Sequence, residues 1–144
     1  MLLRADAKAD HLRRLPLFEL CSKRDVRRIA ALAEERSISD GTELITEGEP
    51  GREFFVVVEG EVEVRRRGRR VARLGSGSYV GEIALLSRSP RTATVTAATP
   101  LRVLAISGTD FVRLLDLLPE LWLKVARTLA DRVDADEAMD ASRA

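Results

Sequence analysis

The residues best suited to chemistry lie in one short run, GEIALLSRSPRTATV, between Gly81 and Val95. Gly81 and Glu82 begin a short apolar turn, and Arg91 follows ten residues after the glycine, between a proline and a threonine. Backbone N–H groups at the start of a helical turn can point toward an anion, a guanidinium can bind it, and a carboxylate can accept hydroxyl hydrogens. The run therefore predicts a site for a small phosphate ester.

Each of these residues also has an ordinary explanation. Arginine is much commoner than lysine in this chain, so Arg91 taken alone could reflect composition, and a single Gly-Glu pair is a weaker signal still. The run is informative because glycine, acid, apolar turn, proline, arginine and threonine occur together.

Helical patterns surround the central part of the chain. In residues 10–35 Ser22 and Asp25 form a plausible capping box, and Pro16 divides this zone into two short helices. A short helix is expected at 109–116, and a long one from Pro119 to about residue 138. An apolar stripe on the long helix could pack on its own domain or on a second copy, and we expect Trp122 to pack on the core; the stripe consists of Leu118, Trp122, Val125, Leu129 and Val133.

The middle of the chain, residues 38–106, has the pattern of an antiparallel β-structure. Glycines separate short runs rich in β-branched residues, which is typical of a barrel or sandwich. The expected strands are 43–46, 53–58, 61–66, 70–74, 92–98 and 101–106. The sequence thus predicts a mainly β fold with flanking helices.

Composition excludes several classes of function. The formal net charge is +1 over 144 residues, which indicates no nucleic-acid or membrane partner, and we find no metal-ligand cluster and no nucleophile–base pair. Cys21 is the only cysteine, and His11, the only histidine, lies among charged residues, where exposure is the usual outcome. No signal-peptide pattern or membrane span is apparent. We expect a cytoplasmic protein without metal or cofactor that is not an enzyme.

The chain resembles the cyclic nucleotide-binding domains of catabolite-activator-type bacterial regulators, cyclic-nucleotide-dependent kinases and cyclic-nucleotide-gated channels. The resemblance covers LRRLPLF, the run ITEGEPGREFFVVVEGEVEV, the run from Gly81 and the closing helices, in the family's order. It implies a jelly-roll-like antiparallel β-roll with short N-terminal helices and a C-terminal lid helix. It also favours a bacterial origin and a single domain at 10–138, with flexible ends at 1–9 and 139–144.

The resemblance also implies roles within the site. Glu82 would accept the ribose 2′-hydroxyl and Arg91 would pair with the cyclic phosphate. The complete set of candidate ligand-binding residues is Gly81, Glu82, Ile83, Ala84, Arg91 and Thr92.

The choice of base stays open, with cAMP preferred to cGMP. Thr92 does not decide it, because members of the family with either preference have this threonine. Val71 could line the base pocket, and three residues of the last helix could cap or accept from the purine, namely Arg132, Asp136 and Glu137.

The expected function is a stand-alone sensor that signals to an unknown effector protein through movement of its C-terminal helix, with homodimerisation through that helix as an open alternative. Few residues follow Ala138, so we expect no helix-turn-helix domain and no direct DNA binding. The arginine hairpin, defined as Arg65, Arg66, Arg67, Arg69 and Arg70 around Gly68, is interpreted as a solvated turn. The competing reading is a ligand-free structural or protein-interaction domain that retains the fold.

Overall fold

A computed structural model describes residues 5–15, 18, 21–50, 52–81 and 90–120, together with 122, 123, 126, 127 and 130. Within this part of the chain the helices are α1 (Ala5–Arg13), α2 (Lys23–Leu32) and α4 (Gly108–Leu117). The strands are β1 (Glu34–Ile38), β2 (Glu43–Ile45), β3 (Glu53–Glu59), β4 (Val62–Arg66), β5 (Arg69–Leu74), β6 (Tyr79–Val80), β7 (Thr94–Ala97) and β8 (Leu101–Ser107).

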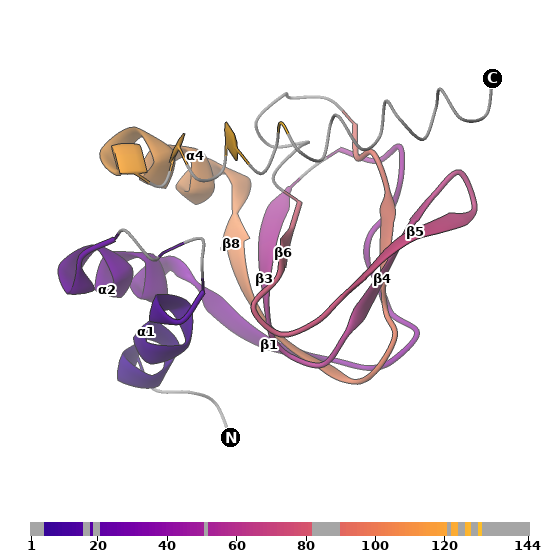
Figure 1. Ribbon diagram of the computed structural model, residues 1–144, viewed down its shortest axis with the longest axis horizontal. Helices are drawn as coiled ribbons and strands as arrows, with labels where there is room; N and C mark the ends of the chain where they lie inside the picture. Colours follow the sequence, from indigo (N-terminus) through magenta and orange to yellow (C-terminus); the bar gives the residue numbers. More distant parts are fainter. Residues whose placement is uncertain are drawn as a thin grey trace.

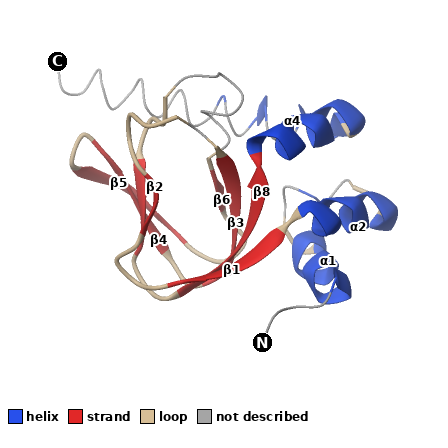
Figure 2. Ribbon diagram, turned by 180° about the vertical axis from the view of Figure 1, so that it is seen from behind, coloured by secondary structure: helices blue, strands red, loops and turns tan. Residues whose placement is uncertain are grey.

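The described strands form two antiparallel sheets of four strands each. One sheet has the order β1-β8-β3-β6 and the other the order β2-β7-β4-β5. Figures 1 and 2 show the two sheets curling around a common interior, with α1, α2 and α4 on one side and the β4–β5 hairpin on the opposite side. This architecture is the mainly antiparallel β-roll with flanking helices that the sequence predicts.

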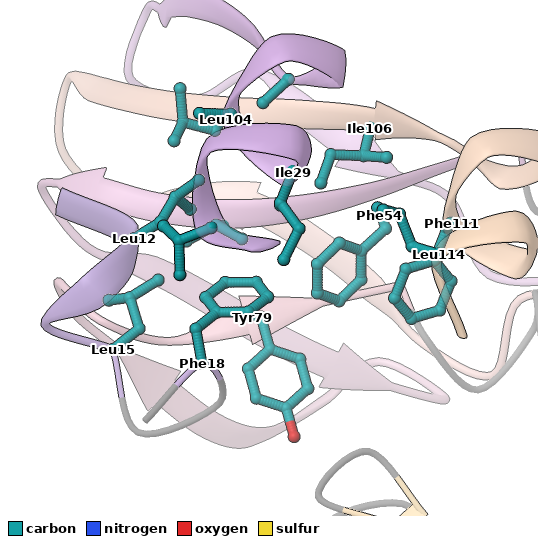
Figure 3. Packing of buried hydrophobic residues seen from close by; sticks show 14 of the residues in the cluster. Leu12, Leu15, Phe18, Ile29, Phe54, Tyr79, Leu104, Ile106, Phe111 and Leu114 are labelled. Carbon is teal, nitrogen blue, oxygen red and sulfur yellow. The ribbon is translucent and has the colours of Figure 1, made fainter. Parts of the chain in front are cut away.

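Strand β3 explains why the run FFVVV is apolar at every position. Phe54 and Val56 belong to a core cluster with the helices, whereas Phe55 and Val57 belong to a second cluster inside the roll. Successive side chains of a strand point to opposite faces, so a strand covered on both faces must be apolar throughout. Phe54 also stacks on Phe111 of α4, with ring centroids 4.4 Å apart, and so joins the roll to that helix (Figure 3).

Helix α2 confirms the predicted start signal. The Ser22 hydroxyl accepts a hydrogen bond from the Asp25 backbone N–H at 3.1 Å, and Val26, Ile29 and Ala30 are buried against the roll. Side chains three and four positions apart share one helix face, which is why this spacing gives a buried stripe.

Three boundaries differ from the sequence prediction. Helix α1 begins at Ala5, before the expected domain start at residue 10; Ala9 is buried, and the Lys8 ammonium donates to the Ala33 carbonyl at 3.0 Å. Strand β1 falls where the helical pattern was extended to residue 35, because its pairing with β8 overrides the local pattern. Strand β6 was missed because two residues leave no periodicity to detect.

The C-terminal region is described at isolated positions. Leu118 is buried, as expected for the apolar stripe, but Trp122 is 45% exposed, so its predicted burial in the core is wrong. Val125, Leu129 and Val133 lie outside the described residues. No helix in the described part of the chain is both long and apolar enough to cross a bilayer.

Candidate functional site

Arg91 is fixed through its backbone by the loop between β2 and β3. Its N–H donates to the Glu49 carbonyl at 2.8 Å, and its own carbonyl accepts from the Gly48 N–H at 2.9 Å. This reciprocal pair of hydrogen bonds attaches the start of the β7 segment to the glycine-marked loop of the sequence. The position of Arg91 therefore depends on a part of the chain more than forty residues away.

The guanidinium of Arg91 is buried and joins two strands. Nη1 donates to the carbonyl of Gly81 at 2.7 Å, and Nη2 donates to the carbonyl of Glu53 at 2.5 Å. In the described residues the last rung of the ladder between β3 and β6 pairs Phe55 with Val80, and both carbonyls lie beyond it. The planar fork thus links the two strands just beyond their last rung, and the two bonds fix the orientation of its plane.

Gly81 is required by the protein's own packing. Its φ is +101°, a backbone conformation that residues with a side chain rarely adopt. A Cβ at this position would lie 2.7 Å from the Glu53 carbonyl oxygen and 2.9 Å from Nη1 of Arg91. The sequence predicts that this glycine lets the backbone approach a ligand; the close approach that the structure shows is to Arg91 and Glu53.

Glu53 takes part in a charge cluster through its side chain. Arg36 of β1 donates from Nη1 to Glu53 Oε1 at 2.9 Å and from Nη2 to Glu53 Oε2 at 2.6 Å, and Nη2 also reaches Glu34 at 3.1 Å. The hydrogen bonds that Arg36 donates to Glu53 and Glu34 raise the pKa of its guanidinium above its ordinary range. The pKa of Glu34 is lowered, first by its hydrogen bond to Arg36 and then by that residue's charge.

The structure brings together some of the predicted site residues and leaves others undescribed. Gly81 and Arg91 are in direct contact, and Thr92 follows Arg91 as a half-buried residue. Three other candidates of the run, Glu82, Ile83 and Ala84, lie outside the described residues, as do Arg132, Asp136 and Glu137 of the last helix. Val71 lies on the edge strand β5 and is exposed.

Sequence reasoning missed the residues that hold Arg91. Glu49, Gly48 and Glu53 contribute backbone groups, which every residue has, so their residue types carry no signal for this role. The clustered glycines of ITEGEPG were the one available hint, because they mark a loop that can approach another segment closely.

The arginine hairpin forms the turn between β4 and β5. Arg65 pairs with Glu63, and the Arg67 N–H donates to the Glu47 carboxylate at 3.1 Å. All of its arginines except Arg66 are exposed, and β5 is an edge strand. Charged side chains on an edge strand discourage pairing with another chain, which agrees with the interpretation as a solvated turn.

In the described residues, helices cover one side of an antiparallel β-roll, and a buried arginine is bonded to strand carbonyls beside a glycine of positive φ. The architecture and this arginine define the structural class of the protein, a helix-flanked antiparallel β-roll. The family model described as "Cyclic nucleotide-binding domain" matches residues 35–117, which include the arginine and the glycine.

Known proteins with similar sequences and structures agree with this match. The cAMP-dependent protein kinase regulatory subunit of Mycosarcoma maydis is 40% identical over 134 residues, covering 86% of this chain and 26% of that relative. The catabolite activator protein of Thermus thermophilus superposes with a TM-score of 0.78 at 28% identity, covering 89% of this chain and 63% of that one. The regulatory subunit of a cAMP-independent protein kinase A from Trypanosoma brucei has a TM-score of 0.82 at 21% identity, over 96% of this chain and 50% of that one, which shows the fold alone.

The chain belongs to the cyclic nucleotide-binding domain family. It spans about a quarter of the length of the Mycosarcoma maydis relative.

Proposed function

We propose that this chain binds a cyclic nucleotide at Arg91 and acts as a regulatory domain rather than an enzyme. The observation that carries the proposal is the buried guanidinium of Arg91, whose plane is set by hydrogen bonds to Gly81 and Glu53. A cyclic phosphate has one negative charge spread over two exocyclic oxygens. A planar fork can bridge both oxygens, and its attraction for them is stronger where water is excluded.

Four further residues complete the proposed site on the strength of family membership. Glu82 would accept the ribose 2′-hydroxyl, the N–H groups of Ile83 and Ala84 would point to the phosphate, and Thr92 would add a hydroxyl beside Arg91. Preference for cAMP over cGMP is supported by the name of the Mycosarcoma maydis relative, a cAMP-dependent regulatory subunit.

Regulation would follow from movement of the C-terminal helix. A ligand shifts a conformational equilibrium only as far as it binds one state more tightly, so the state with the lid helix closed must have the higher affinity. We propose a cytoplasmic sensor that presents a changed surface to an effector protein, without contacting DNA itself. Homodimerisation through the same helix stays part of the proposal. The exposed Trp122 supports it, because burying this apolar ring against a second copy would be favourable.

A ligand-free structural domain is the second candidate. Arg91 already has a structural task, since it links β3 and β6 beyond the end of their ladder. The same fold also occurs in the regulatory subunit of a protein kinase A from Trypanosoma brucei that is named cAMP-independent. The contacts of Arg91 alone therefore do not require a nucleotide.

Isothermal titration of the chain with cAMP and cGMP separates the two candidates. We expect saturable binding that is tighter for cAMP. In a separate denaturation experiment, cAMP at about 100 times its dissociation constant should raise the free energy of unfolding by roughly 2.7 kcal/mol. Arg91→Lys should weaken cAMP binding about 10- to 100-fold, because an ammonium cannot hold two carbonyls and two phosphate oxygens at once. The control is Arg69→Ala, which removes an exposed arginine at the start of β5, in the turn of the β4–β5 hairpin, and should leave the affinity for cAMP unchanged.

Two results would overturn the proposal. Absence of heat with both nucleotides at high protein concentration would favour the ligand-free domain. Binding that is equally tight in wild type and Arg91→Lys would show that the phosphate lies elsewhere.

A further inference from the structure

The Arg36–Glu53 ion pair lies next to the proposed phosphate site. Both terminal nitrogens of Arg36 donate to the two carboxylate oxygens of Glu53, at 2.9 and 2.6 Å. Each side chain is about one-third exposed. In this bidentate arrangement two parallel hydrogen bonds fix the relative orientation of the two side chains, in addition to the attraction between their charges.

The ion pair crosses a strand on the inner face of the roll. Strands β1 and β3 lie on either side of β8, and Arg36 is opposite Val103 while Glu53 is opposite Ser107. Directly opposed residues of antiparallel strands share a face, and Val103 belongs to the cluster inside the roll. The pair therefore ties β1 to the beginning of β3 at the end of the interior where Arg91 lies.

The backbone of Glu53 is the part of β3 that contacts Arg91. Glu53 is the first residue of the strand, and the last rung toward β6 is at Phe55. Beyond this rung, within the described residues, the Glu53 carbonyl accepts Nη2 of Arg91 at 2.5 Å. A rotation of the Glu53 peptide plane would move this oxygen and, with it, the guanidinium.

We propose that Arg36 and Glu53 are positioning residues for Arg91. Their ion pair holds Glu53 so that its carbonyl oxygen keeps the Arg91 guanidinium in the orientation that a cyclic phosphate requires. The part of this proposal that concerns a ligand rests on the proposed function, whereas the part that concerns the orientation of Arg91 does not.

Charge balance gives the pair a second consequence. Arg36 compensates the carboxylate of Glu53, so this ion pair by itself has no net charge beside the phosphate site; Glu34, the other partner of Arg36, is an exposed residue on the same strand. Removing Arg36 alone leaves that carboxylate without its bidentate partner, and the negative charge then opposes an incoming phosphate. Arg36→Met should therefore impair phosphate binding more than the double variant Arg36→Met/Glu53→Gln does.

The first test needs no ligand and follows the Arg91 guanidinium hydrogens by NMR, with their signals assigned by comparison with Arg91→Lys. In wild type these hydrogens should exchange slowly with water because they are buried and bonded to carbonyls. In Arg36→Met they should exchange about tenfold faster, because the equilibrium constant for local opening rises about tenfold, which is about 1.4 kcal/mol. The matched control is Arg73→Met, which breaks the exposed Arg73–Glu61 pair on the other sheet and should change nothing.

The second test measures the affinities for the Sp and Rp phosphorothioate diastereomers of cAMP, which differ only in the exocyclic position of the sulfur. A misaligned guanidinium distinguishes the two positions poorly, so the affinity ratio should move several-fold toward one in Arg36→Met and remain at the wild-type value in Arg73→Met. Exchanging the charges, Arg36→Glu with Glu53→Arg, should restore part of the ratio. A merely structural role would weaken both diastereomers equally.

An unchanged exchange rate for Arg91 in a folded Arg36→Met protein would overturn the positioning role. So would equal weakening of both diastereomers. Wild-type protein that binds neither diastereomer overturns the nucleotide function instead, and the exchange rate still decides whether the pair positions Arg91.

Discussion

Arg91 and Gly81 lie so close together that the Arg91 guanidinium leaves no room for a side chain at position 81. Nη1 of Arg91 donates to the Gly81 carbonyl at 2.7 Å, and the same nitrogen would lie 2.9 Å from a Cβ built on Gly81. Any side chain at position 81 would compete with the guanidinium for this space. The glycine and the arginine that stand ten residues apart in the sequence are therefore two halves of one contact.

Replacing this glycine should affect both stability and binding. In Gly81→Ala the new Cβ would meet the backbone oxygen of Glu53 at 2.7 Å, and φ would stay at +101°. A side chain in left-handed backbone costs about 1–2 kcal/mol, and overpacking adds about 1–3 kcal/mol. We expect chemical denaturation to show a loss of about 2–5 kcal/mol, and titration to show weaker cAMP binding.

The matched control for this prediction is Gly41→Ala. Gly41 also has a positive φ, +81°, but a Cβ there would meet nothing within 4 Å. It should lose only the backbone part, about 1–2 kcal/mol, and keep its affinity for cAMP. Equal losses in the two variants would show that the close contact between positions 81 and 91 is unimportant.

The run from Gly81 to Val95 could be predicted from sequence because its residue types are unusual together, but its supports could not. The oxygens that hold Arg91 belong to the backbones of Gly81 and Glu53. Every residue has a backbone carbonyl, so the residue type does not indicate this role. Their closeness depends on where the β3–β6 ladder ends, which is a property of the sheet rather than of either segment.

The fold shows the same division between local and long-range information. Strand β3 was predictable because burial on both faces produces a continuous apolar run. Strand β1, with the sequence EERSI, begins with three charged residues, and two of them find their partners on other strands. Glu35 is buried and bonded to Arg102 of β8, and Arg36 pairs with Glu53 of β3. The helix-like appearance of β1 in the sequence is a consequence of reading it without its partner strand.

The Glu35–Arg102 pair gives a prediction for stability away from the site. The Glu35 side chain is 3% exposed, whereas that of Arg102 is 33% exposed. Arg102→Met leaves a buried carboxylate without this partner, and we expect a loss of about 2–3 kcal/mol, below the range for fully buried pairs because water still reaches Arg102. The double variant Glu35→Met/Arg102→Met should recover much of this loss.

Arg73→Met is the control for this second prediction, because both members of its pair with Glu61 are about half exposed. Its cost should be at most about 1 kcal/mol, as for other surface pairs. Urea denaturation of the four proteins checks the series. A double variant that is less stable than Arg102→Met would show that the ion pair itself, rather than the uncompensated charge, dominates.

The third prediction concerns pH and the outer carboxylate of the Arg36 cluster. The pKa of Glu34 is lowered from its ordinary value of 4.5 by its hydrogen bond to Arg36 and by the charge of that residue. A carboxyl group with a lowered pKa in the folded state stabilises the protein fully above the pKa of the unfolded chain. This contribution is lost as the pH falls from 4.5 through the lower pKa of the folded state, because both states then bind the proton.

Glu34→Gln isolates this contribution. The variant should be slightly less stable than wild type at pH 7, and the two stability curves should converge as the pH falls below 4.5. Added salt should reduce the difference at pH 7, because the pair is exposed and screened. Glu53, which holds Arg36 at the shorter distance of 2.6 Å, should keep Arg91 in place in this variant, so cAMP affinity at pH 7 should be unchanged. A stability difference that persists at pH 2 would mean that the glutamate acts through packing rather than through its charge.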